Sequence, residues 1–371
     1  MTLTDLQIDP GSGTPLVRQI RDHLLGRIED GTLEHNARLP SMRSFSEQTG
    51  VSVGIVRQAI GELTHTGHLR VDARRGVYVS RPRLKVTDVA VVLPMVRSHF
   101  VPDLLDGVLG TLRNTEYRVV VESAHGSFRE EVRLIERLDR AFLAGTLVSP
   151  PPFAADAAVI RDLVDRGLPC VQVLVSVDDR AAPSVTADDF EMGRRAVEVL
   201  TDAGHRRIAV LDTNADAASI RTLRAGLDAG LAAVGLSLAG VPVVRGDAGQ
   251  LDAEAPYEAS EESASYLLKK HPETTAVVGM TPNRAIGACR AALSCGLRVP
   301  EDLSVVAVAG DSEAAAHTGP GITALDRPTR AIGQRAALML RQMIGGDKPA
   351  QANIQLQPVF KPRGSVAAPR S

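Results

Sequence analysis

The chain has 371 residues, 44% of them hydrophobic and 23% charged, which is ordinary for a globular protein and long enough for two or three domains. No apolar run reaches transmembrane length, and residues 1–10 lack the basic and apolar parts of an export signal. The three cysteines, Cys170, Cys289 and Cys295, form no CxxC pair. We therefore expect a cytoplasmic protein without disulfide bonds.

The net charge of −2 conceals a basic segment near the N-terminus. Residues 36–83 hold eight arginines and three acidic residues, a local charge of +5, whereas residues 1–35 carry −3 and the remainder carries −4. Counterion release from a nucleic acid needs only a local cluster of cations. The charge pattern therefore favours a nucleic-acid contact within residues 36–83.

Residues 1–80 predict three helices followed by a β-hairpin. An apolar repeat at helical spacing indicates a first helix over residues 16–30. Ser41 and Ser52 can each cap a further short helix, and residues 69–79 predict two strands joined by a tight turn. Three helices and a basic hairpin in this order are the plan of a winged helix-turn-helix.

The third helix is the expected recognition element, because the second helix of such a motif places its N-terminal part in the major groove. Arginine offers a planar fork to a phosphate or a guanine edge, and serine hydroxyls with free amides at helix starts suit phosphate oxygens. The predicted DNA contacts are Ser41, Arg43, Ser52, Val53, Gly54, Arg57, Arg74, Arg75 and Gly76. Taken singly, each arginine could equally be a solvated surface residue.

Residues 15–79 resemble the DNA-binding domain of the GntR family of bacterial transcription regulators. The matching features are Leu-Pro-Ser-x-Arg at 39–43, Val-Ser at 51–52, Val-Arg-x-Ala at 56–59 and Gly-x-aromatic-Val at 76–79. The chain departs from the family at Val53, where arginine is frequent, and at Arg74, where the wing has a glycine. The resemblance implies that a dimer binds a roughly palindromic operator in double-stranded DNA. The departures affect the operator sequence that we would expect, and not the DNA-binding role.

From residue 86 onward, strand-like apolar runs alternate with helical stretches. This alternation predicts parallel sheets covered by helices on both faces, and the length suggests two α/β lobes. Residues 81–83 read Arg-Pro-Arg, a stiff and basic connection. We therefore expect an α/β protein with a winged helix-turn-helix domain over 1–80, a linker over 81–85 and a two-lobed domain over 86–371.

The second region resembles the LacI-type regulatory domain, which has the periplasmic-binding-protein fold. The matching segments are residues 185–193, 200–209, 296–306 and 322–328. The resemblance implies an effector held between two lobes and a homodimer formed through this domain. By residue type alone, the Gly-His-Arg-Arg segment at 204–207 could be a metal or catalytic cluster, but the resemblance makes it a structural turn.

Ligands of parallel α/β sheets bind beyond the carboxyl ends of the strands. The predicted ligand contacts are Arg97, Ser98, His99, Phe100, Ser123, Ser149, Asp188, Arg221, Asn283 and Asp311; each could instead be a cap or loop residue. The cleft offers few carboxylates to grip sugar hydroxyls, because Thr281-Pro282 stands where sugar-binding relatives often have Asn-Asp. A sugar, a sugar-like or acidic metabolite, and a non-sugar metabolite all stay open as effectors.

The order of the domains predicts a ligand-responsive transcriptional regulator, a repressor whose effector changes the geometry of the two DNA-binding modules. One alternative is a regulator with a degenerate cleft that ignores ligands. Another is an enzyme, since GntR-type modules are sometimes fused to a pyridoxal-phosphate domain. None of the five lysines lies on a strand-turn with acidic partners, and motifs of hydrolases, metalloproteases and phosphate-binding loops are absent. We therefore expect no catalytic site, cofactor, metal or membrane partner.

Overall fold

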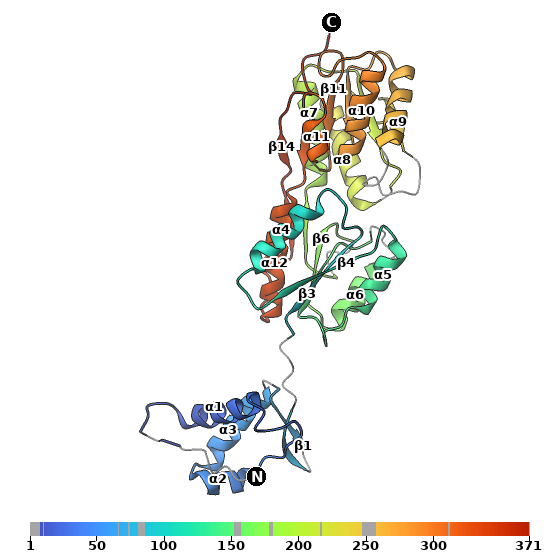
Figure 1. Ribbon diagram of the computed structural model, residues 1–371. Helices are drawn as coiled ribbons and strands as arrows, with labels where there is room; N and C mark the ends of the chain where they lie inside the picture. The colour runs from blue at the N-terminus through green and yellow to red at the C-terminus, as the bar shows by residue number, and fades with distance from the viewer. Residues whose placement is uncertain are drawn as a thin grey trace. The chain divides into compact units, whose positions relative to one another are not determined.

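The computed structural model describes residues 8–9, 11–65, 67–72, 75–80, 86–151, 157–177, 181–215, 217–246, 257–310 and 312–370. The chain divides into two compact units, Met1–Val86 and Thr87–Ser371 (Figure 1). The predicted linker over 81–85 lies outside the described residues.

The first unit has three helices followed by an antiparallel hairpin. Its elements are α1 (Leu16–Glu29), α2 (Met42–Thr49), α3 (Val53–His65), β1 (Leu69–Asp72) and β2 (Gly76–Val79). Apolar side chains from all three helices and both strands form one core around Phe45. Ser41 caps α2 by accepting a hydrogen bond from the Ser44 amide at 3.1 Å, and Gly50 ends this helix at a φ of 70°. The predicted winged helix-turn-helix is confirmed.

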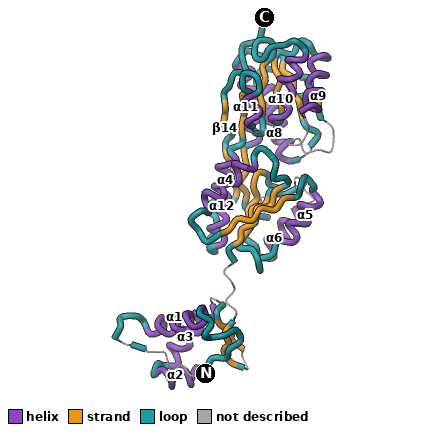
Figure 2. Tube along the Cα trace, in the orientation of Figure 1, coloured by secondary structure: helices purple, strands orange, loops and turns teal. Residues whose placement is uncertain are grey.

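The second unit contains two six-stranded sheets, each with helices on both faces. The first lobe has the strand order β4–β3–β5–β6–β7–β13, with every described pair parallel. Its strands are β3 (Asp88–Leu93), β4 (Arg118–Ser123), β5 (Gly145–Val148), β6 (Cys170–Leu174), β7 (Ser184–Ala187) and β13 (Asn353–Leu356). Figure 2 shows them between α4 (Val101–Leu112) and α12 (Thr329–Ile344) on one face and α5 (Phe128–Arg137) and α6 (Ala157–Asp165) on the other.

The second lobe has the order β9–β8–β10–β11–β12–β14, in which β14 alone is antiparallel among the described pairs. Its strands are β8 (Ile208–Asp212), β9 (Val243–Arg245), β10 (Ala276–Gly279), β11 (Ser304–Ala307), β12 (Thr323–Asp326) and β14 (Val359–Lys361). Its helices are α7 (Asp189–Asp202), α8 (Ala218–Ala232), α9 (Tyr257–Lys270), α10 (Pro282–Ser294) and α11 (Glu313–His317). The expected α/β fold with parallel sheets is therefore confirmed.

Three segments cross between the lobes, at residues 187–189, 326–329 and 356–359. After the first crossing, α7 packs against α8, and after the second, α12 packs against α4 of the first lobe. Both helix pairs approach closely through glycines: a Cβ at Gly226 would collide with the Phe190 carbonyl, and one at Gly333 would collide with the Leu104 carbonyl. Only glycine permits backbones to lie this close. Each lobe is thus joined firmly to a helix that arrives from the other lobe.

Candidate DNA interface and interlobe cavity

The first unit presents most of its predicted DNA contacts to solvent. Arg43 on α2 is 89% exposed, with a long contact of 3.5 Å to Glu47, and Arg57 on α3 is exposed as well. Ser52 is exposed and its hydroxyl accepts from the Ile55 amide at 3.4 Å. A Cβ built on Gly54 would have only the Ser52 hydroxyl within 4 Å, at 3.9 Å. The start of α3 is therefore open to solvent, and α2 and α3 each carry an exposed arginine.

At the hairpin, Arg75 is exposed, whereas Arg74 lies outside the described residues. Two arginines that the sequence analysis did not select also lie here. The Arg38 guanidinium lies over Gly76, 3.2 Å from the position of a Cβ, and Arg70 lies 4.7 Å from the centre of the Tyr78 ring. These contacts hold the guanidinium groups in place on the hairpin. Arg70 faces Tyr78 across the predicted hairpin, whereas Arg38 is brought to the hairpin only by tertiary pairing, so no local motif marks it.

The predicted ligand contacts are dispersed over several strand ends. Asp188 is the cap of α7: its Oδ1 accepts from the Glu191 amide at 2.9 Å. Ser149 is buried, Ser123 accepts from the His125 amide at 3.4 Å, and Arg221 is exposed. Arg97 is exposed, Ser98 is buried, Phe100 precedes α4, Asn283 lies in the first turn of α10 and Asp311 lies outside the described residues.

One predicted ligand residue reaches across to the other lobe. The His99 ring, which follows β3, fills the space that a Cβ would occupy at Gly310, and Gly310 follows β11. Gly310 has a φ of 148°, which favours glycine. The loop after β3 and the loop after β11 therefore meet, as expected for strand ends that face one cleft.

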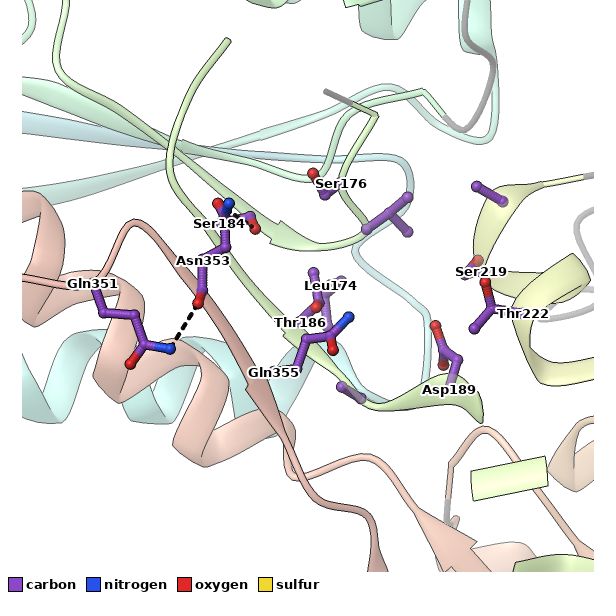
Figure 3. Close-up of a pocket in the computed structure, with 13 residues that line it drawn as sticks. Leu174, Ser176, Ser184, Thr186, Asp189, Ser219, Thr222, Gln351, Asn353 and Gln355 are labelled. Carbon is purple, nitrogen blue, oxygen red and sulfur yellow. Dashed lines mark hydrogen bonds between the residues drawn. The ribbon is translucent and has the colours of Figure 1, made fainter. Parts of the chain in front are cut away.

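A cavity of about 500 Å³ lies between the lobes. Its described lining is Leu174, Val175, Ser176, Ser184, Thr186, Ala187, Gln351, Asn353 and Gln355 from the first lobe, and Asp189, Ala218, Ser219 and Thr222 from the second. Figure 3 shows Ser184, Thr186, Asn353 and Gln355 across the cavity from Ser219, Thr222 and Asp189. Most of these side chains are hydroxyls or amides, so the site suits a ligand with several hydrogen-bonding groups.

None of the predicted ligand residues is among the described residues that line this cavity. The sequence analysis missed its lining for two reasons. Residues 184–187 and 353–356 were not recognised as strands, and Ser, Thr, Asn and Gln carry no motif of their own. A signal was present in Asn353-Ile-Gln-Leu, whose polar and apolar residues alternate as in a strand with one buried face.

Hydrogen bonds to two aspartates link the segments that cross between the lobes. Arg327 Nη2 donates to Asp189 Oδ1 at 2.8 Å, joining the second crossing to the first. Gln357 Nε2 donates to Asp188 Oδ2 at 3.1 Å, joining the third crossing to the first. All three crossings therefore meet at the start of α7, beside the cavity.

A second ionic cluster lies at the end of β8. Asp212 is 1% exposed and accepts from Arg224 Nε at 3.0 Å and from Arg245 Nε at 3.1 Å. Arg224 on α8 is thus fixed by a buried carboxylate. Its guanidinium also donates to the Thr213 carbonyl at 2.5 Å, so this cluster serves the structure of the second lobe.

Within the described residues, no group of three or more His, Cys, Asp or Glu side chains is arranged to hold a metal ion. No described helix is both long enough and apolar enough to cross a membrane.

Comparisons with known proteins agree with the two-unit architecture. Residues 16–79 match the bacterial regulatory proteins of the gntR family, and residues 197–366 match the periplasmic binding protein-like domain. The chain is 27% identical to the arabinose metabolism transcriptional repressor of Geobacillus stearothermophilus over 339 residues, 89% of this chain and 91% of that protein.

Solved structures show the same fold. A LacI family transcriptional regulator from Mycobacterium smegmatis superimposes with a TM-score of 0.61 at 25% identity, covering 76% of this chain and all of that one. A lac repressor dimer, solved with operator and an anti-inducer, gives a TM-score of 0.66 at 21% identity over 77% of this chain and 96% of that one.

The fold and its relatives define a ligand-binding transcriptional regulator. More particularly, the chain joins a gntR-type DNA-binding domain to a periplasmic-binding-protein-like domain, which is similar in fold to that of a LacI family regulator.

Proposed function

We propose that the chain is a homodimeric repressor that acts in the cytoplasm and releases or gains a roughly palindromic operator when a small metabolite binds between its lobes. The observation that carries this proposal is the presence, on one chain, of a helix-turn-helix with exposed arginines and a cavity whose walls come from both lobes. We propose further that it catalyses no reaction, and that residues 1–80 and 86–371 are its two functional domains.

The proposed mechanism is a shift between two arrangements of the lobes. A ligand that contacts both walls of the cavity binds one arrangement more tightly and so increases its population. In a dimer, the lobes then set the spacing of the two DNA-binding units on the operator. A coupling of about 1–3 kcal/mol would change operator affinity roughly 5–150-fold.

A mobility-shift assay on DNA upstream of the chain's own gene, run with a panel of metabolites, tests the proposal. We expect specific retardation that at least one metabolite changes. Arg43→Ala and Arg57→Ala should each weaken specific binding tenfold or more, because each removes a guanidinium from the DNA-facing side. Ligand-induced thermal stabilisation should be unchanged in both variants. If no upstream fragment is retarded specifically, the proposal is wrong.

The second candidate is a regulator that responds to no ligand. One observation favours it: none of the predicted ligand residues is among the described residues that line the cavity. Operator binding that no metabolite alters would support this candidate over the first.

A further inference from the structure

We propose that Asp189 is the residue that recognises the effector, by accepting a hydrogen bond from a hydroxyl or N–H group of an uncharged ligand, and that Arg327 transmits this contact to the lobe crossings. This inference rests on the proposed function. It narrows the effector from any metabolite to an uncharged one and names the residue pair that couples binding to lobe movement.

The charge of the cavity supports an uncharged ligand. Asp189 is the one charged side chain among the described residues of the lining, and it is paired with Arg327, which lies just outside that lining. An anionic ligand would lose its hydration beside a carboxylate, and the described wall holds no cation to replace that hydration. A cationic ligand would find the carboxylate already paired with a guanidinium. The remaining polar side chains of the wall carry no charge.

The burial of the pair makes the contact strong enough to discriminate between ligands. The Asp189 side chain is 8% exposed and that of Arg327 is 15% exposed. Hydrogen bonds to a carboxylate are stronger than those between neutral groups, and an unsatisfied buried polar group is costly. A ligand that offers a donor here is therefore favoured over one of the same shape that lacks it.

The position of the pair connects the cavity to the movement of the lobes. Asp189 is the first residue of α7 and ends the first crossing, while Arg327 lies in the second crossing between β12 and α12. Among the described residues, the buried Nε of Arg327 has no acceptor. The guanidinium of Arg327 can therefore donate a further hydrogen bond from Nε. A ligand that also donates to the Asp189 carboxylate can change the hydrogen bond between Asp189 and Arg327, and with it the contact between the first and second crossings.

The class of ligand is tested on the full-length chain with matched probes. The uncharged probes are D-glucose, D-galactose, L-arabinose, cellobiose, adenosine and cytidine; the charged ones are D-glucuronate, D-galacturonate, glucose 6-phosphate and D-glucosamine. We expect at least one uncharged probe to raise the melting temperature and to bind tenfold or more tightly than every charged probe of the panel. Tighter binding by a charged probe, or no binding by any uncharged probe, overturns the assignment.

Two variants then separate recognition from coupling, with the best uncharged probe from the panel. Asp189→Asn should bind that probe tenfold or more weakly, because the amide replaces a charged acceptor of nearly the same shape. Arg327→Gln should bind it within about threefold of the wild type, yet the probe should no longer change operator affinity. The matched control is Asp162→Asn on α6, which breaks the exposed pair with Arg166 (2.9 Å). Neither residue is among the described lining of the cavity, so this variant should behave as the wild type.

Wild-type probe affinity in Asp189→Asn would overturn the recognition role, and a wild-type operator response in Arg327→Gln would overturn the coupling role. If Asp189→Asn fails to fold, Arg327→Gln still decides the coupling and the probe panel still decides the ligand class. Failure of the wild type to bind operator DNA would refute the proposed function separately, because probe binding is measured without DNA.

Discussion

His205, in the turn over 204–207, is a buried structural histidine. It is 1% exposed, and its Nδ1 lies 2.9 Å from Thr275 Oγ1. Its Nε2 lies 2.9 Å from both Ser304 Oγ and the Ala367 carbonyl. A carbonyl can only accept, so Nε2–H donates to it and Nδ1 accepts from the threonine hydroxyl. The histidine therefore ties the C-terminal segment to the base of the second lobe, in agreement with the structural role expected for this turn.

Burial lowers the pKa of His205 below its ordinary value of 6.5. On acidification, His205 therefore binds a proton in the unfolded chain before it does so in the folded chain. Its contribution to the free energy of unfolding is fully present above about pH 6.5 and is lost as the pH falls toward the pKa of His205 in the folded chain. We expect His205→Gln to lose this contribution to the pH dependence, measured by urea unfolding between pH 7.5 and 5. His317→Gln, on the exposed α11, is the control. Equal pH slopes in His205→Gln and the wild type would contradict the prediction.

The three cysteines should differ sharply in reactivity. Burial raises the pKa of Cys170 and of Cys289 to about 12, whereas Cys295 is exposed. Only the thiolate is a nucleophile, so we expect one fast-reacting thiol per native chain with a thiol reagent such as DTNB and three after unfolding. Cys295→Ser should abolish the fast phase. A fast phase that persists in this variant would contradict the burial of the other two.

Paired glycines decide how the elements of each lobe pack. A Cβ at Gly226 on α8 would collide with the Phe190 carbonyl on α7, whereas Gly110, also inside a helix, has nothing within 4 Å. We expect Gly226→Ala to destabilise the chain by about 1–3 kcal/mol in urea unfolding, because the two helices must separate. Gly110→Ala should instead stabilise it by roughly 0.5–1 kcal/mol through helix propensity. Equal changes in the free energy of unfolding for the two variants would show that α7 and α8 do not pack closely at Gly226.

The elements that the sequence analysis missed are short strands completed by distant partners. β7 and β13 have four residues each and pair in parallel, although about 170 residues separate them. β14 is an edge strand in which Val359 and Phe360 are partly exposed. Such strands have weak local signals, because β-propensity reflects tertiary packing more than intrinsic backbone preference. The buried strands β7 and β12 were missed, whereas the long helices and the other buried strands were predicted, since their periodicity is local.

At the scale of the whole molecule, charge separates the two binding functions. The basic segment lies within the first unit, whereas the described wall of the interlobe cavity carries one charged side chain. If the protein contacts about four phosphates, we expect operator affinity to fall about a hundredfold between 50 and 200 mM salt. Each phosphate contact contributes ~0.9 to the slope with which the logarithm of the affinity falls against the logarithm of the salt concentration.

The thermal shift produced by an uncharged effector should change little over the same salt range, because uncharged contacts release no counterions. Titrations of DNA and of ligand at several salt concentrations measure both slopes. A similar salt dependence for the binding of DNA and of the effector would contradict the view that only the DNA-binding unit acts through positive charge.

The sequence by itself determined the winged helix-turn-helix, the two α/β lobes and the clustering of arginines in the first unit. Helical periodicity, cap residues and clustered arginines are local properties, so they can be read along the chain. The tertiary structure alone decided which polar side chains form the cavity. Ser184, Asn353 and Ser219 come from strands and a helix far apart in sequence, and only the parallel pairing of β7 with β13 and the crossing of α7 onto α8 bring them together. The physical reason is that long-range pairing, and not local propensity, fixes where uncharged polar groups converge.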